Sequence, residues 1–194
     1  DSDDSYLAIT SSNYLASTEK LNYVYKNVDI ANLSVLNINP TNEHILTQFD
    51  VSIAALSIDS TIEINCIIYG EWAVVGSTYG AGYNCIAYIK VFNDFGIEVD
   101  SLKNDNINNT GGAGLGVFIE SMHQNNKNKL DRCNFTSFYK PGTTNNRTYK
   151  VIIRNNHNEN QYFTLNYGML NDNTQFNENL VSSISLNLSC ASLV

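Results

Sequence analysis

The feature that most constrains this chain is an alternation of apolar and polar residues with a period of two. Between residues 61 and 69, Ile62, Ile64, Cys66 and Ile68 alternate with a second set that includes Glu63 and Asn65. A period of two places successive side chains on opposite faces of an extended strand, whereas a helix repeats every 3.6 residues. The same period recurs at residues 149–154 and 184–190. The sequence therefore predicts an all-β chain.

Two of the predicted strands carry further information. Residues 45–55 predict one apolar face, formed by Ile45, Thr47, Phe49, Val51, Ile53 and Ala55. Residues 85–92 are apolar at odd and even positions alike, so we expect cover on both faces, from a second sheet and from a neighbouring subunit. The residues Asn93–Gly96 favour a tight turn into residues 97–99, which predicts a hairpin.

About ten short strands are separated by gaps rich in asparagine and glycine. The chain has 30 asparagines among 194 residues, and many lie in these gaps, where asparagine tolerates turn conformations. This spacing predicts an antiparallel β-sandwich of the jelly-roll type. We expect one β-sandwich domain over residues 21–194. We interpret the polar residues 1–20 as an N-terminal arm that pairs with a neighbouring chain or, alternatively, as a solvated tail.

Charge and composition exclude several classes of partner. Eleven basic and 19 acidic residues give a net charge of −8, which argues against binding to a nucleic-acid backbone. No apolar run approaches the roughly 20 residues that a membrane helix needs, so we expect no membrane insertion.

Motifs of catalysis are equally scarce. His44, His123 and His157 lie far apart in polar surroundings, and no metal-ligand spacing occurs. The glycine-rich residues 111–116 lack the spacing of a dinucleotide-binding loop. We interpret the possible carboxylate pairs as solvated charges; they are Glu63 with Glu71 and Asp94 with Glu98. The sequence therefore predicts no catalytic residue, no metal and no cofactor, and we expect a protein that is not an enzyme.

The cysteines and the glycosylation motifs do not establish the cellular compartment of the protein. The four cysteines are Cys66, Cys85, Cys133 and Cys190. Each lies in an apolar run, which favours buried free thiols over the alternative of two disulfides. Candidate glycosylation sites, if the protein is secreted, are Asn32, Asn108, Asn134, Asn146 and Asn187. A chain this rich in asparagine, serine and threonine yields about five such motifs by chance, so they do not establish secretion.

Residues 71–84 favour a binding role. They combine Trp72, Tyr79 and Tyr83 with three glycines, and exposed tyrosine beside flexible glycine suits contact with glycans or proteins. Tyr79 and Tyr83 are therefore the candidate receptor contacts, although they could equally lie at a subunit contact. We expect Trp72 to be a core residue.

Several segments resemble one family of viral domains. They are ILTQFDVSIAAL, CIAYIKVFNDFGIEV, FTSFYKPGTTNNRTYKVIIRN, QYFTLNYGML and SSISLNLSCAS, which fall between residues 45 and 192. Together they resemble the trimeric jelly-roll domains of bacteriophage and related viral fibres and head decorations. These domains are similar to the sandwich of tumour necrosis factor and the complement globular head. The long insert at residues 103–130 and the four cysteines depart from that pattern.

The resemblance implies a homotrimer at the virion surface that contacts other virion proteins. It further implies host attachment through a host-surface glycan or protein. We therefore expect a virion structural protein, as a fibre or a capsid decoration. The alternative is a secreted, glycosylated adhesin or lectin with the same β-sandwich fold.

Overall fold

The structure is a computed structural model and describes residues 23–28, 36–74, 84–103, 116–119, 131–155, 161–166 and 180–189. These residues form strands and turns, with no helix among them. The strands are β1 (Tyr23–Val28), β2 (Leu36–Ile38), β3 (Glu43–Ala54), β4 (Thr61–Val74), β5 (Asn84–Phe92), β6 (Glu98–Leu102), β7 (Gly116–Ile119), β8 (Asp131–Tyr139), β9 (Asn146–Asn155), β10 (Gln161–Leu165) and β11 (Ser182–Ser189). No helix capable of spanning a membrane is found in this described part of the chain.

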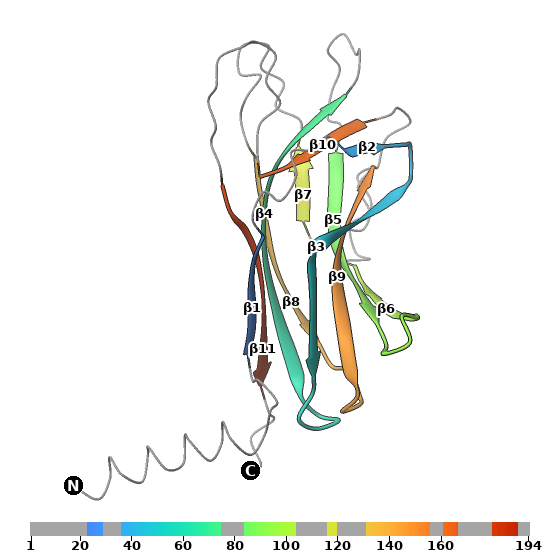
Figure 1. The fold of residues 1–194 in the computed structure, drawn as a ribbon, viewed down its shortest axis with the longest axis vertical. Helices are drawn as coiled ribbons and strands as arrows, with labels where there is room; N and C mark the ends of the chain where they lie inside the picture. Colours follow the sequence, from blue (N-terminus) through green and yellow to red (C-terminus); the bar gives the residue numbers. More distant parts are fainter. Residues whose placement is uncertain are drawn as a thin grey trace, which may run out of the picture.

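The strands form two antiparallel sheets, and the longer ones run along the long axis of the molecule (Figure 1). In the six-stranded sheet, β1 pairs with β11, β11 and β10 pair with one edge of β4, β8 pairs with the other edge, and β2 pairs with β10. In the five-stranded sheet, β3 pairs with β9 and β9 with β5, and β6 and β7 share the far edge of β5.

The pairing is nested along the chain. β1 pairs with β11, β3 with β9, β4 with β8, and β5 with β6 and β7. An antiparallel ribbon folded back on itself in this way is the winding of a jelly roll. The predicted all-β sandwich of about ten strands is therefore confirmed, and the described residues form eleven strands. Strands β1 and β2 are additions that the sequence interpretation did not include.

The core lies between the two sheets. As predicted, Ile62, Ile64, Cys66 and Ile68 of β4 are buried in it. β10 crosses β4 closely at Gly70, where a Cβ atom would lie 2.5 Å from the Phe163 ring. Each fully buried aliphatic side chain contributes about 1.5–3 kcal/mol, so this alternation supplies much of the stability of the sandwich.

One predicted strand face is partly wrong. Phe49, Val51, Ile53 and Ala55 are buried as expected, but Ile45 and Thr47 are exposed and Leu46 is buried in their place. The cause is a β-bulge. Leu46 pairs with Val151 and Val51 with Tyr149, so five steps along β3 match two along β9. The extra residues reverse which positions face the core.

Cover on both faces of β5 is confirmed, since Ile86 and Tyr88 are buried on the side opposite the core. The expected reason for that cover is wrong. Both side chains are buried within a single chain, so this strand does not require a neighbouring subunit.

Candidate functional site

The outer face of the six-stranded sheet, turned away from the core, carries two rows of side chains across β1, β11 and β4. The first row consists of Tyr23, Asn187 and Glu63, and the second consists of Tyr25, Ser185 and Asn65. Paired residues of antiparallel strands point to the same side of a sheet, so these six side chains share one surface. We call these six residues the polar platform.

The edge of the polar platform is aromatic. Tyr23 and Tyr25 are 49% and 51% exposed. Their rings stack with centroids 6.3 Å apart and planes inclined by 10°. The Tyr25 hydroxyl donates a hydrogen bond to Asn27 Oδ1 at 2.5 Å. The two rings therefore present an ordered apolar surface beside the polar rows.

The centre of the polar platform is hydrogen-bonded within β4 and across to β11 and β8. Asn65 Nδ2 donates to Glu63 Oε1 at 3.1 Å, and Asn187 Nδ2 donates to Glu63 Oε2 at 3.4 Å. Thr136 of β8 donates to Asn65 Oδ1 at 2.7 Å. A carboxylate offers about four acceptor positions and an amide several more, so these groups keep capacity for a ligand. Glu63 is the one charged residue of the six.

A buried asparagine fixes the strands of the polar platform to one another. Asn166, just after β10, has the positive φ of 64° that asparagine tolerates. Its Nδ2 donates to the Val28 carbonyl at the end of β1, and its backbone N–H donates to Tyr69 of β4 at 2.8 Å. The backbone N–H of Ser182, where β11 begins, donates to Asn166 Oδ1 at 3.1 Å. One residue thus joins β1 and β11 through its side chain and β4 through its backbone.

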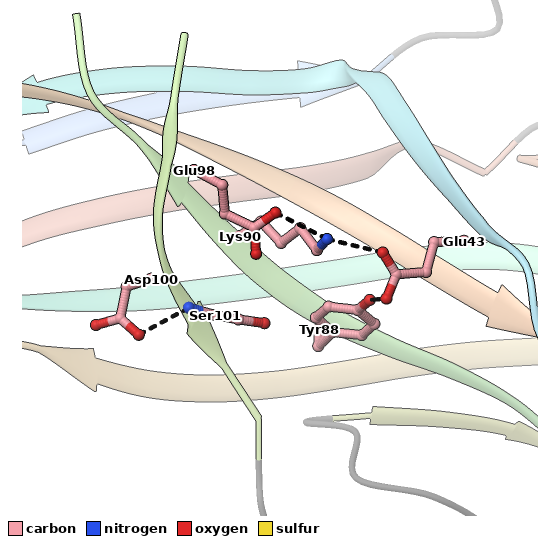
Figure 2. A network of polar contacts seen from close by, with 6 residues as sticks. All are labelled: Glu43, Tyr88, Lys90, Glu98, Asp100 and Ser101. Atoms are coloured by element: carbon pink, nitrogen blue, oxygen red, sulfur yellow. Dashed lines mark hydrogen bonds and ion pairs between the residues drawn. The ribbon is translucent and has the colours of Figure 1, made fainter.

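The outer face of the five-stranded sheet is different, because its polar groups are ionic. Figure 2 shows Lys90 of β5 between two carboxylates, with Nζ 2.8 Å from Glu43 Oε2 and 2.9 Å from Glu98 Oε2. The Tyr88 hydroxyl donates to the other oxygen of Glu43. These contacts tie β3 and β6 to the central strand. We call Glu43, Tyr88, Lys90 and Glu98 the charged network.

The charged network shifts the pKa of its members. Burial alone would raise the pKa of Glu43, but hydrogen bonds from Lys90 and Tyr88 outweigh it and hold the pKa below its ordinary value. Burial alone would lower the pKa of Lys90, but its bonds to Glu43 and Glu98 leave it raised. Burial and the bond to Glu43 both raise the pKa of Tyr88. Each group is therefore held in the charge state that its partners need.

Two more lysines on this face lie over aromatic rings. Lys103 Nζ is 4.7 Å from the centre of the Tyr88 ring, and Lys150 Nζ is 4.9 Å from that of Phe92. Lys150 also forms an ion pair with Asp50 at 3.2 Å. The lysines of this face are therefore engaged by other residues of the chain, which indicates a structural role.

The β5–β6 hairpin carries an exposed apolar tip. Phe95, Ile97 and Val99 are 88%, 60% and 44% exposed. The predicted turn is confirmed: Gly96, at φ 74°, donates to the Asn93 carbonyl at 3.0 Å, and Asn93 Oδ1 accepts from the N–H groups of Phe95 and Ile97. The tip is thus an ordered projection, and we call Phe95, Ile97 and Val99 the apolar tip.

The candidate residues predicted from sequence fall in several places. Tyr79 and Tyr83 lie outside the described residues, as do the arm of residues 1–20 and the sequons at Asn32 and Asn108. Trp72 lies in β4 with its backbone paired to Phe163; its side chain is outside the description. The other sequon positions are Asn134 and Asn146, which are exposed, and Asn187, which is half-buried in the polar platform.

The described cysteines are free thiols, as favoured from the sequence. Cys66, Cys85 and Cys133 are buried and unpaired, while Cys190 lies outside the described residues. Burial raises the pKa of all three, that of Cys133 to about 12. They therefore act as small apolar residues of the core.

The described residues contain no group of three or more His, Cys, Asp or Glu side chains able to hold a metal ion. His44 lies half-buried in β3, where burial lowers its pKa, and His123 and His157 lie outside the description. Glu63 bonds to two amides and Glu98 to Lys90, so the interpretation of both as charges of strand faces agrees with their contacts.

Sequence reasoning missed Tyr23 and Tyr25, although a signal was available. The residues Tyr23–Val28 read YVYKNV, in which tyrosine alternates with valine, a period-two pattern beside the predicted arm. Their place opposite Glu63 and Asn65 depends on pairing with β11, which local sequence does not reveal.

No family model and no curated protein matches the sequence. Solved structures do match. The match to a structure of infectious bursal disease virus, Gt strain, spans 87% of this chain and 38% of the solved chain, with a TM-score of 0.46 and 10% sequence identity. The match to the VP2 subviral particle of that virus spans 86% of this chain and 37% of the solved chain, with a TM-score of 0.40 and 10% identity. The match to a CocE/NonD family hydrolase from Staphylococcus aureus spans 87% of this chain and 37% of the solved chain, with a TM-score of 0.37 and 11% identity.

The chain spans less than two fifths of the length of these solved chains. At this similarity a viral capsid protein and a hydrolase match alike, so the matches do not distinguish between functions. Viral capsid proteins are among the structural neighbours of the chain, and the expectation of a fibre or head-decoration domain stays a prediction.

Proposed function

We propose that this chain is a non-enzymatic structural protein of a virus particle, as a fibre or capsid decoration at the virion surface. It assembles as a homotrimer, contacts other virion proteins and contributes to host attachment through a host-surface glycan or protein. The nested jelly-roll winding supports this proposal, together with the resemblance of the segments between residues 45 and 192 to viral fibre domains.

The single observation that carries the proposal is the apolar tip. Phe95, Ile97 and Val99 are exposed within five residues on a turn that hydrogen bonds hold in place. Contiguous exposed apolar groups mark association sites, and an ordered projection loses little entropy on binding. The tip therefore has the properties of an anchor in a protein interface.

The apolar tip suits assembly into a closed ring of subunits. A head-to-tail interface joins two different patches of the same chain and closes when the rotation between subunits allows it. We assign the apolar tip to one of these two patches. Phe138 of β8 is 68% exposed as well, but it pairs with Glu63 and so continues the face of the polar platform.

Sedimentation velocity at micromolar concentration tests the assembly. Three chains of 21.6 kDa make a particle of 64.8 kDa. Ile97→Ser should shift the equilibrium toward the monomer. Ile58→Ser is the matched control, because Ile58 is 61% exposed against 60% for Ile97 and belongs to the turn between β3 and β4 rather than to the hairpin. A wild-type monomer, or equal effects of the two variants, contradicts the proposal.

The alternative, a secreted glycosylated adhesin or lectin, is favoured by the exposed sequons at Asn134 and Asn146. The free thiols oppose the form with two disulfides, since two disulfides would use all four cysteines. Intact mass of protein from its native source separates the two functions. Added hexose, or a gain of four protons on reduction, supports the alternative, whereas an unmodified mass supports the virion protein.

A further inference from the structure

We propose that the polar platform is a binding site for a neutral glycan, with a sugar ring over Tyr23 and Tyr25 and its hydroxyls bonded by Glu63, Asn65 and Asn187. The inference deepens the proposed function, on which its biological meaning rests, by naming the ligand of host attachment and its place. It assigns the glycan contact to Tyr23 and Tyr25, whereas the sequence favoured Tyr79 and Tyr83, which lie outside the described residues.

The aromatic edge supplies the apolar half of such a site. The two rings are half exposed, and their planes are inclined by only 10°. A pyranose ring has one face made of C–H groups, and this face packs on the electron-rich surface of an aromatic ring. Tyrosine also loses little conformational entropy on binding. The pair is therefore suited to hold a sugar by its apolar face.

The adjoining strands supply the polar half. Two strand spacings separate Tyr25 from Asn65 across Ser185, which is about 10 Å. Within that width lie a carboxylate, two amides and a hydroxyl. Neighbouring sugar hydroxyls act as donors and acceptors together, and amide and carboxylate groups are planar partners for them. The polar platform thus offers both kinds of contact side by side.

The polar groups are already oriented. Asn65 and Asn187 each donate to a separate oxygen of Glu63, and Thr136 donates to Asn65. The ladder of β1, β11 and β4 is further fixed at one end by Asn166. Side chains that are ordered before binding lose less entropy when the ligand arrives, which favours recognition of a weakly binding polar ligand.

Charge selects a neutral glycan over an acidic one. Glu63 is the one charged residue among the six, and the whole chain carries a net charge of −8. A sialylated, sulfated or phosphorylated sugar would bring a second negative charge to Glu63 with no lysine or arginine in the polar platform. Neutral hexoses avoid this repulsion.

The test uses the full chain and pairs of neutral and sialylated oligosaccharides, such as lactose with sialyllactose, within a panel that also contains maltotriose and mannotriose. Saturation-transfer NMR identifies the sugars that bind, and titration calorimetry measures their affinity. We expect at least one neutral sugar to bind and its sialylated counterpart to bind more weakly. Tyr25→Ala should weaken binding about tenfold, the equivalent of one lost stacking contact.

The control is Phe95→Ala, which removes the exposed ring of the apolar tip on the other sheet and should leave sugar affinity unchanged. Failure of every neutral sugar to bind overturns the inference, as does equal affinity of Tyr25→Ala and wild type.

Sedimentation of the same samples separates this inference from the proposed function. A monomer that binds the sugar upholds the site alone, and a trimer that binds none upholds assembly alone. Loss of the trimer in Tyr25→Ala with sugar binding unchanged assigns the face to assembly and overturns the site.

Discussion

The two outer faces of the sandwich use polar residues in opposite ways. On the five-stranded sheet, Lys90 lies between Glu43 and Glu98 and forms an ion pair with each carboxylate. On the six-stranded sheet, Glu63 accepts hydrogen bonds from two amides, and two tyrosines of the same face stay half exposed. The charged network links three strands of its sheet, whereas the polar platform retains unused donors and acceptors. The difference indicates that one face stabilises the fold and the other is available for a ligand.

The largest expected effect is the loss of folding stability when the lysine of the charged network is removed. Lys90→Met leaves Glu43 and Glu98 without their shared cation, so the free energy of unfolding should fall by about 2 kcal/mol. Lys140→Met removes an exposed lysine after β8 and should cost less than about 0.5 kcal/mol. Urea denaturation measures both. Equal losses would show that the charged network contributes no special stability.

A second pair of variants compares hydroxyl groups. Tyr88→Phe removes a buried hydroxyl that donates to Glu43, which should cost about 1 kcal/mol. Tyr25→Phe removes an exposed one that donates to Asn27 and should change stability by less than about 0.5 kcal/mol. Thermal unfolding followed by circular dichroism gives both values. A larger loss in Tyr25→Phe would reverse the assignment of the two faces.

Acid should weaken the charged face. The pKa of Glu43 in the folded protein lies below its ordinary value of 4.5, so Glu43 adds stability above pH 4.5 that is lost as the pH falls through the lowered value. Glu43→Gln lacks this contribution. The stability advantage of wild type over Glu43→Gln should therefore shrink below pH 4.5, as measured by urea denaturation across a pH series. An advantage that stays constant would mean that the Glu43 charge is not stabilised in the folded protein.

The smallest expected effect is on the polar platform. Glu63→Gln keeps the size of the side chain and one acceptor for the amides, so the free energy of unfolding should change by less than about 0.5 kcal/mol. Glu43→Gln is the matched substitution on the other face and should cost more at neutral pH. A Glu63→Gln variant that is the less stable of the two would contradict a ligand-binding role for that face.

Local sequence predicted the strands better than their partners. The alternation around Ile62 and Ile64 identified β4 and its buried face, because the period of a strand depends only on residues that are close together in the sequence. The β3 bulge was missed, because it depends on how β3 pairs with β9. The polar platform was missed for the same reason. Glu63 and Tyr23 lie 40 residues apart in the sequence and meet only through β11.

Asparagine shows a similar limit. Its clusters were interpreted as turn chemistry, which fits Asn93 in the hairpin. Asn155 and Asn166 are instead buried, and their side chains bind the carbonyls of Ile38 and Val28. Composition identified a residue suited to unusual backbone and polar contacts. It did not show which copies would become buried links between strands.

The central claim is that association through the apolar tip leaves the polar platform open. Hydroxyl-radical footprinting read by mass spectrometry, across concentrations from monomer to assembly, tests it directly. Assembly should reduce modification of Phe95, while Tyr23, Tyr25 and Phe138, which lie on the face of the polar platform, should remain as reactive as in the monomer. Protection of Tyr23 and Tyr25 with Phe95 still reactive would contradict it.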